Sequence, residues 1–228
     1  MTDLNQFLIT QKWPAQHPER LQLYSLPTPN GVKVSIMLEE VKLPYEVHRI
    51  AFDKNEQTSP EFMALNPNNK IPAIIDPDGP GGKPLPLFES GAILLYLGGK
   101  TGRFLPADLR ARCDCVQWLF WQMAGLGPML GQNHHFANYA PEKIPYAIKR
   151  YVKETSRLYA VLDRRLADRE VVAGDYTIAD MACYPWIQPD RQGQDIEQFP
   201  HLKRWKAAIA ARPAVERAYA LARRVNTK

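Results

Sequence analysis

The chain has 228 residues, of which 45% are hydrophobic and 23% are charged. This composition is typical of a folded globular protein, and the length allows one large domain or two ordinary ones. No apolar run approaches the ~18 residues that cross a bilayer, and the start of the chain has no pattern of a signal peptide. We therefore expect a cytoplasmic protein without a membrane partner.

The net charge of +5 is modest. The Lys and Arg residues after Lys203 are interspersed with Ala, Leu and Tyr, as on the solvent face of amphipathic helices. No nucleic-acid-binding motif accompanies them, so we expect no nucleic-acid partner and favour a mildly positive cleft for a small anionic ligand.

The cysteines Cys113, Cys115 and Cys183 are odd in number, which favours reduced thiols. Cys113 and Cys115 lack the two-residue gap of a thioredoxin-type motif and lie in a helical pattern. We interpret them as packing residues and not as a redox pair.

Residues 1–20 predict an irregular arm that is either disordered or laid across the body. Residues 21–100 then alternate between strand patterns of period two and short helical patterns. Their order, β-α-β-α-β-β-α, predicts a thioredoxin-like α/β domain with a small mixed sheet. The predicted strands are 21–26, 45–52, 73–75 and 85–88, and the predicted helices are 32–41, 60–65 and 91–98.

Residues 101–112 are a predicted linker, and residues 113–228 predict an all-helical C-terminal domain. Residues 113–130 carry large apolar side chains all round, so this helix is expected to be central. Thr177 and Asp180 match a capping box that opens a helix at Met181. Further helices are predicted at 146–167, 199–211 and 214–224.

Two short segments of the first domain suit a zwitterionic peptide. Pro72 holds Ile71 extended, so the main-chain N–H and C=O of Ile71 can pair with a peptide as an added strand would. Glu89 and Ser90 lie where a strand ends and a helix begins. Ser90 is a candidate N-cap at a carboxylate-binding helix start, and Glu89 can pair with an amine. Each segment alone more often marks an ordinary X-Pro turn or a capped helix, and their combination is the specific signal.

The turn before the first helix of this domain contains Thr28 and Asn30. A thioredoxin-like domain usually carries its chemistry there, because the helix dipole favours anions. The turn holds no cysteine, which excludes dithiol chemistry by the protein's own thiols at this place. Thr28 and Asn30 can instead hydrogen-bond the sulfur of a ligand and lower the pKa of its thiol. The alternative is that both residues only shape a proline-rich turn.

Together these features resemble the glutathione transferase superfamily, and several segments are similar to its bacterial nu-class. The similar segments span the chain from residue 21 nearly to its end, and those in the helical domain are the most class-specific. They are Thr28-Pro-Asn-Gly31, Asn66-Pro-Asn-Asn-Lys-Ile-Pro-Ala73, Leu87-Phe-Glu-Ser-Gly-Ala-Ile-Leu-Leu-Tyr-Leu97, Gln117-Trp-Leu-Phe-Trp-Gln122, Gly127-Pro-Met-Leu-Gly-Gln-Asn-His-His-Phe136 and Tyr146-Ala-Ile-Lys-Arg-Tyr151.

The resemblance implies a glutathione site in which Thr28 and Asn30 face the sulfur. It implies that the main chain of Ile71, before a cis Pro72, pairs with the cysteinyl part. The other residues that the resemblance implies fall into three groups: Glu89 and Ser90 for the γ-glutamyl end, Gln57, Lys70 and Arg150 as further glutathione contacts, and Asn133 and His134 as candidates for a second pocket.

The resemblance further implies a homodimeric enzyme that binds two glutathione molecules, or one glutathione disulfide, and reduces a small disulfide. One bound thiolate would attack that disulfide, and the second glutathione would resolve the mixed disulfide. Two alternatives remain: a transferase that conjugates glutathione to an electrophile, and a non-catalytic binding module with the transferase fold.

The resemblance gives Thr177 and Asp180 a structural role, as the superfamily's folding box. Adjacent His134 and His135 would point apart on a helix and have no acidic or cysteine partner at ligand spacing. We therefore expect no metal site, and glutathione as the sole cosubstrate.

Overall fold

The computed structural model describes residues 4–226, with the backbone alone for 222–226. The chain forms two compact units, one of residues up to Thr101 together with the C-terminal helix α11 (Pro213–Asn226), the other Gly102–Arg212. None of the described helices is long and apolar enough to cross a membrane.

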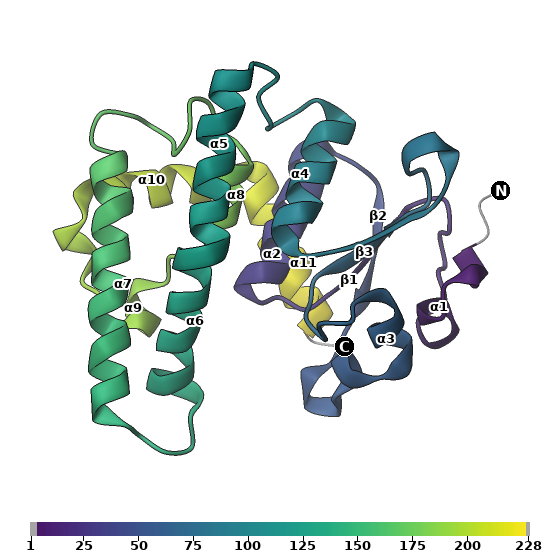
Figure 1. Ribbon diagram of the computed structural model, residues 1–228, viewed down its shortest axis with the longest axis horizontal. Coiled ribbons are helices and arrows are strands. Elements are labelled where there is room, and N and C mark those ends of the chain that lie inside the picture. The colour runs from purple at the N-terminus through teal and green to yellow at the C-terminus, as the bar shows by residue number, and fades with distance from the viewer. Residues whose placement is uncertain (1–3, 227–228) are drawn as a thin grey trace. The chain divides into compact units, whose positions relative to one another are not determined.

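The first unit is built on a four-stranded mixed sheet with strand order β2-β1-β3-β4 (Figure 1). The strands are β1 (Leu21–Ser25), β2 (Tyr45–Arg49), β3 (Ala73–Asp76) and β4 (Leu85–Phe88). Strand β1 is parallel to β2 and antiparallel to β3, and β4 is antiparallel to β3. This topology confirms the predicted thioredoxin-like arrangement.

Helices cover both faces of this sheet, and its two central strands, β1 and β3, are buried along their whole length. Leu23 and Ile74 are fully buried beside α2 (Pro29–Val41) and α4 (Ser90–Thr101), which pack against each other. Tyr24, Ala73 and Ile75 belong to the core cluster on the other face, with Phe62 of α3 (Pro60–Leu65). Figure 1 shows α2 and α4 on one side of the sheet and α3 on the other.

The N-terminal arm is laid across the body, which was one of its two predicted states. It has more secondary structure than its sequence pattern predicts, with a 3-10 turn at Leu4–Gln6 and the short helix α1 (Ile9–Lys12). Leu4 and Ile9 are buried in the same core cluster as Phe62, because the arm supplies the apolar cover that α3 alone is too short to provide.

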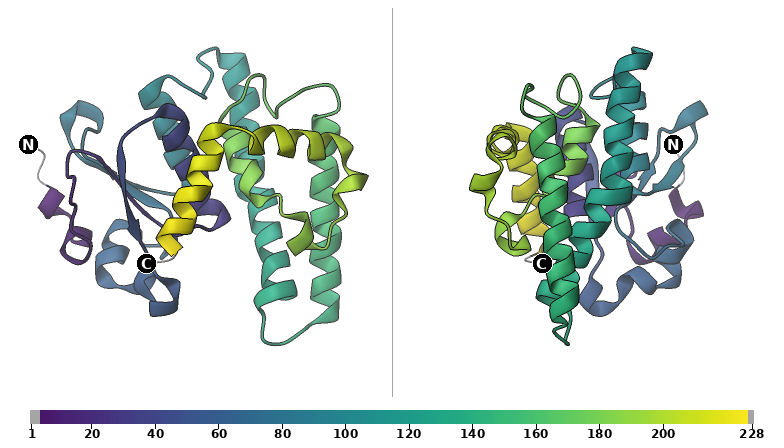
Figure 2. Two further views of the ribbon diagram at one scale, coloured as in Figure 1. Left: turned by 180° about the vertical axis from the view of Figure 1, so that it is seen from behind. Right: turned by 60° about the vertical axis from the view of Figure 1, so that its left-hand side comes forward.

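Helix α11 belongs to the first unit, whereas the sequence pattern groups residues 113–228 in one helical domain. It packs along α2 (Figure 2) and buries Ala214, Val215 and Ala218. Arg217 Nε also pairs with Glu39 Oε2 of α2 at 2.7 Å. The helical period of α11 shows which face it buries, but not which unit covers that face, and so its partner is not evident from sequence.

The second unit is helical, as predicted. The expected central helix begins at α5 (Leu109–Trp121) and continues through a π-helical segment (Gln122–Leu126), α6 (Gly127–His134) and a second π-helical segment (His135–Tyr139). Helix α7 (Pro145–Arg165) packs against α6, and α8 (Ile178–Cys183) packs against α5. Two shorter helices complete the unit, α9 (Pro189–Gln192) and α10 (Pro200–Ala210).

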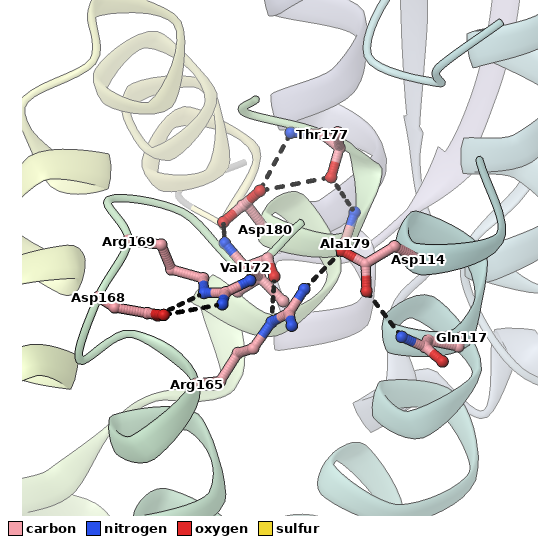
Figure 3. Close-up of polar contacts among 9 residues, drawn as sticks. All are labelled: Asp114, Gln117, Arg165, Asp168, Arg169, Val172, Thr177, Ala179 and Asp180. Carbon is pink, nitrogen blue, oxygen red and sulfur yellow. Dashed lines mark hydrogen bonds and ion pairs between the residues drawn. The ribbon is translucent and has the colours of Figure 1, made fainter. Parts of the chain in front are cut away.

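The predicted capping box of α8 is present (Figure 3). Thr177 Oγ1 accepts from Ala179 N, and Asp180 Oδ2 accepts from Thr177 N at 3.0 Å. Asp180 Oδ1 accepts from Val172 N at 2.9 Å and from the indole of Trp205 at 2.8 Å. Burial raises the pKa of Asp180, and these hydrogen bonds lower it in part. The box thus joins α8 to α10 and to the loop that follows α7.

The loop after α7 is also held from α7 itself. Arg165 Nε donates to Val172 O at 2.8 Å, and the Arg165 guanidinium pairs with Asp114 of α5 (Figure 3). The carboxylate of Asp114 also accepts from Gln117 Nε2, while Asp168 and Arg169 pair at the surface.

Candidate active site

The predicted site residues of the first unit lie on segments that meet at one edge of the sheet. Tyr24 of β1 is paired with Ala73 of β3, and Ala73 with Phe88 of β4. Because these pairs are antiparallel, the segment after β1, the segment before β3 and the segment after β4 share that edge. They carry Thr28 and Asn30, Ile71 and Pro72, and Glu89 and Ser90, respectively.

Thr28 is the N-cap residue of α2, in an extended conformation before Pro29. Its Oγ1 accepts a hydrogen bond from Gly31 N at 3.3 Å, while its hydroxyl hydrogen has no acceptor among the described residues. The hydroxyl can therefore cap the helix and donate outward at the same time. Asn30 lies in the first turn of α2, two residues after Thr28.

Gly31 was missed by sequence reasoning, although it fixes how closely α2 approaches β1. A Cβ placed on Gly31 would lie 2.0 Å from Leu26 O and 2.5 Å from Ser25 Oγ. A side chain would thus push the first turn of α2 away from the end of β1, and Thr28 with it. Its signal in the sequence, a Gly directly after Asn in a Pro-rich turn, does not reveal this close approach.

The Ile71–Pro72 peptide is cis, as the resemblance implies. The side chain of Ile71 is buried in the core cluster, but its main-chain N–H and C=O have no hydrogen-bond partner among the described residues. Asn66 holds the preceding loop, since its side chain donates to Lys70 O and accepts from Asn68 N at 2.9 Å. Lys70 itself is exposed. An extended ligand could therefore pair with the Ile71 main chain without breaking an existing bond.

The junction of β4 and α4 differs from the predicted cap by one residue. Ser90 is the first residue of α4, and the carbonyl of Glu89 accepts the first helical bond, from Ile93 N at 2.9 Å. Glu89 thus holds the capping position, with φ at 70° in the left-handed region. Its side chain is exposed, whereas Ser90 is 3% exposed. The sequence prediction placed the cap at Ser90 because serine is a preferred N-cap residue and glutamate is not.

Gln57 lies beyond the end of β2, which reaches the same edge because Ser25 of β1 is paired with Arg49. It belongs to the 3-10 turn Glu56–Thr58, and its Oε1 atom is buried without a hydrogen-bond partner in the described structure. A buried acceptor without a donor is costly, so this atom suits the N–H of a ligand.

The predicted residues of the second unit have different surroundings. Arg150 is exposed on α7, with Met129, Tyr146, Glu154 and Arg157 lining the same surface hollow. Asn133 and His134 are buried inside the unit, at 1% and 5% exposure. The role predicted for them in a second pocket remains a prediction.

The side chains of Asn133 and His134 take part in a buried polar network. Asn133 Nδ2 donates to Thr155 Oγ1 at 2.9 Å and to Gln192 O at 3.2 Å. His134 Nε2 lies 3.1 Å from Gln192 Nε2, and the ring stacks on Trp186. Burial, assisted by the charge of Arg191, lowers the pKa of His134 to about 4. His134 is therefore neutral near pH 7 and accepts the hydrogen bond of the Gln192 amide.

None of the site segments in the first unit contains a thiol. Cys113, Cys115 and Cys183 all lie in the second unit and are free cysteines, with Cys115 and Cys183 buried. Burial raises the pKa of Cys115, which makes its thiol less reactive. Within the described residues no group of three or more His, Cys, Asp or Glu is placed to hold a metal ion.

Comparison with known families matches both units. The family model described as "Glutathione S-transferase, N-terminal domain" matches residues 19–99, and the model of the C-terminal domain of the same family matches residues 133–213.

Among curated proteins, the chain is 52% identical to the Disulfide-bond oxidoreductase YfcG of Escherichia coli strain K12, over 87% of this chain and 94% of that protein. It is 45% identical to the Disulfide-bond oxidoreductase YghU of the same strain, over 89% of this chain and 74% of that protein.

Two solved structures are similar in fold and sequence. One is a glutathione transferase of Burkholderia graminis with two glutathione molecules bound per subunit, at TM-score 0.92 and 55% identity, covering 96% of this chain and 95% of that one. The other is a glutathione transferase of Pseudomonas putida with one glutathione disulfide bound per subunit, at TM-score 0.91 and 52% identity, covering 95% of this chain and 98% of that one.

Proposed function

Because this chain belongs to the glutathione S-transferase family, we propose that it is a glutathione-dependent disulfide reductase that binds two glutathione molecules or one glutathione disulfide. The observation that carries the proposal is the shared sheet edge. It presents an unpaired main chain at Ile71, a hydroxyl donor at Thr28 and no protein thiol. The reported functions and bound ligands of the relatives support the same chemistry.

In the proposed reaction the attacking sulfur comes with the ligand. The hydroxyl of Thr28 and the amide of Asn30 donate to the sulfur of the first glutathione, which stabilises the thiolate and lowers the pKa of that thiol. The thiolate attacks one sulfur of the substrate disulfide, forms a mixed disulfide and releases the other sulfur as a thiolate that takes up a proton. A second glutathione thiolate attacks the glutathione sulfur of the mixed disulfide. The products are glutathione disulfide and the second substrate thiol.

The remaining contacts are proposed on the same basis. The Ile71 main chain, before Pro72, pairs with the cysteinyl part, while Glu89 and Ser90 hold the amine and carboxylate of the γ-glutamyl end. The unpartnered Gln57 Oε1 accepts from the ligand. Lys70 and Arg150 are proposed glutathione contacts by resemblance alone. We also propose a homodimer in a reducing compartment such as the cytoplasm, where the three free thiols would persist.

A conjugating transferase is the second candidate, because similar solved structures are described as glutathione transferases. Parallel assays with bis(2-hydroxyethyl) disulfide and 1-chloro-2,4-dinitrobenzene separate the two. We expect disulfide reduction to be faster, and faster conjugation would reverse the order. Millimolar glutathione should also raise the melting temperature, which a module that does not bind glutathione would not show.

The origin of the attacking sulfur is tested in the same assay. Reduction should stop when glutathione is omitted and should persist in a variant with Cys113, Cys115 and Cys183 replaced by Ala. Turnover without glutathione, or loss of activity in a folded cysteine-free variant, would contradict the mechanism.

A further inference from the structure

Lys33 is a buried lysine that none of the proposed steps uses. It lies on α2 in an apolar run, between Val32 and Val34, and is 1% exposed. Lysine is almost never fully buried, because the ammonium loses its hydration unless polar partners replace it. The position of this side chain therefore calls for a physical reason.

The ammonium of Lys33 lies at the first residue of α4. Lys33 Nζ donates to Ser90 Oγ at 3.3 Å, and both side chains are buried where α2 packs on α4 (Figure 1). Ser90 is also the proposed contact for the γ-glutamyl end of glutathione. Lys33 would thus act on the proposed ligand through Ser90, without contacting the ligand itself.

Two sources of positive potential coincide at this place. The first turn of α4 carries the partial positive charge of a helix N-terminus, and Lys33 in its ammonium form adds a charge that solvent screens little because the side chain is buried. Both favour an anion at Ser90 over a neutral group of the same shape. The exposed carboxylate of Glu89, next to Ser90, favours a cation instead. Glu89 and Ser90 together therefore suit the ammonium and the carboxylate of one amino acid.

We propose that Lys33 is the specificity-determining cation for the α-carboxylate of the γ-glutamyl end, acting through Ser90 as a positioning residue. This inference rests on the proposed glutathione site. The Lys33 ammonium orients the Ser90 hydroxyl and attracts the carboxylate by charge. It has no part in the chemistry at the sulfur, where Thr28 and Asn30 act.

The test compares two ligands by isothermal titration. One is glutathione, and the other is its analogue with the γ-glutamyl α-carboxylate converted to a primary amide, which has the same shape without the charge. The wild-type protein should bind the amide about tenfold more weakly, as expected for a lost charge-assisted contact. Lys33→Met should bind glutathione several-fold more weakly and should discriminate between the two ligands less than the wild type does, because only the N-terminus of α4 then favours the carboxylate.

The matched control is Lys83→Met. Lys83 is an exposed lysine in the connection from β3 to β4, and this connection lies at the opposite edge of the sheet from the site. Lys83→Met should discriminate between glutathione and the amide analogue as the wild type does. At saturating glutathione, Lys33→Met should keep its kcat within about twofold while its KM rises, because it acts on binding and not on the thiolate.

Lys33→Met with unchanged discrimination, or with equal losses of affinity for both ligands, would overturn the proposal and leave Lys33 as a purely structural link between α2 and α4. Should Lys33→Met not fold, Lys33→Gln takes its place under the same criterion. A wild-type protein that binds both ligands equally overturns the proposal without any variant. A wild-type protein that does not bind glutathione at millimolar concentration overturns the proposed function itself.

Discussion

The hydroxyl oxygen of Thr28 accepts a hydrogen bond from the main-chain N–H of Gly31 at 3.3 Å, so the side chain that we propose to act on the ligand sulfur also caps α2. The Thr28 oxygen accepts the capping hydrogen bond, and the hydrogen of the same hydroxyl can still be donated to a ligand. A substitution at Thr28 therefore has two separable effects, one on stability and one on turnover.

Thr28→Ala should lower kcat for disulfide reduction by about tenfold or more, because the thiolate loses a donor that stabilises its charge. The affinity for glutathione should stay within a few-fold, since most contacts to the tripeptide are made elsewhere. The free energy of unfolding should fall by about 1 kcal/mol from the lost cap. Steady-state kinetics, titration and urea unfolding measure the three quantities.

Thr28→Ser is the matched control, because it keeps both the cap and the hydroxyl. It should retain most of the turnover and the stability. An unchanged kcat in Thr28→Ala would remove Thr28 from the mechanism and leave it as a capping residue only.

Gly31→Ala should destabilise the first unit by about 2 kcal/mol or more, because the new Cβ would lie 2.0 Å from the main-chain oxygen of Leu26. Relief of this contact requires the first turn of α2 to move, so turnover should fall along with stability. The control is Gly99→Ala in α4, where a Cβ meets no atom within 4 Å. Gly99→Ala should be neutral or slightly stabilising in chemical unfolding.

Much of this site could be predicted from local chemistry. Pro72 fixes an extended Ile71, because its effect acts on the neighbouring residue. The cap at Thr28 was missed, since the predicted helix begins at Val32 and the structural one at Pro29. The alternation of strand and helix patterns also indicated the thioredoxin-like unit.

What the sequence could not show depends on contacts between distant segments. The role proposed for Lys33 depends on α4 packing over α2, and the place of α11 depends on which apolar face it meets. Leu4 and Ile9 looked like part of an irregular arm because their partners, such as Phe62, lie over fifty residues away. The buried surroundings of Asn133 and His134 arise in the same way, from the return of α9 onto α6 and α7.

Asp180→Ala should lower the free energy of unfolding of the second unit by about 3 kcal/mol or more. It would leave the buried N–H groups of Val172, Thr177 and Trp205 without acceptors. The control is Asp168→Ala, which removes only an exposed ion pair with Arg169 and should change stability little (Figure 3). Urea unfolding followed by tryptophan fluorescence measures both. Equal stability of the two variants would contradict the structural role of the capping box.

The buried His134 should make the stability of the second unit depend on pH. Its pKa is lowered from the ordinary 6.5 to about 4, so the unfolded chain takes up a proton more readily than the folded one. The contribution of the neutral imidazole is therefore fully present above pH 6.5 and is lost as the pH falls toward 4. Between pH 7 and pH 5 this loss should be about 2 kcal/mol.

The comparison that isolates His134 is His134→Gln, whose stability should change less over the same pH interval. Burial also lowers the pKa of His48 in the first unit. The wild type and His134→Gln should therefore both lose stability from His48 as the pH falls. His17→Gln, at an exposed histidine of the arm, is the control and should follow the wild type. Urea unfolding curves at pH 7, 6 and 5 measure the effect. Parallel curves for the wild type and His134→Gln would show that the imidazole is protonated in the fold as easily as in the unfolded chain.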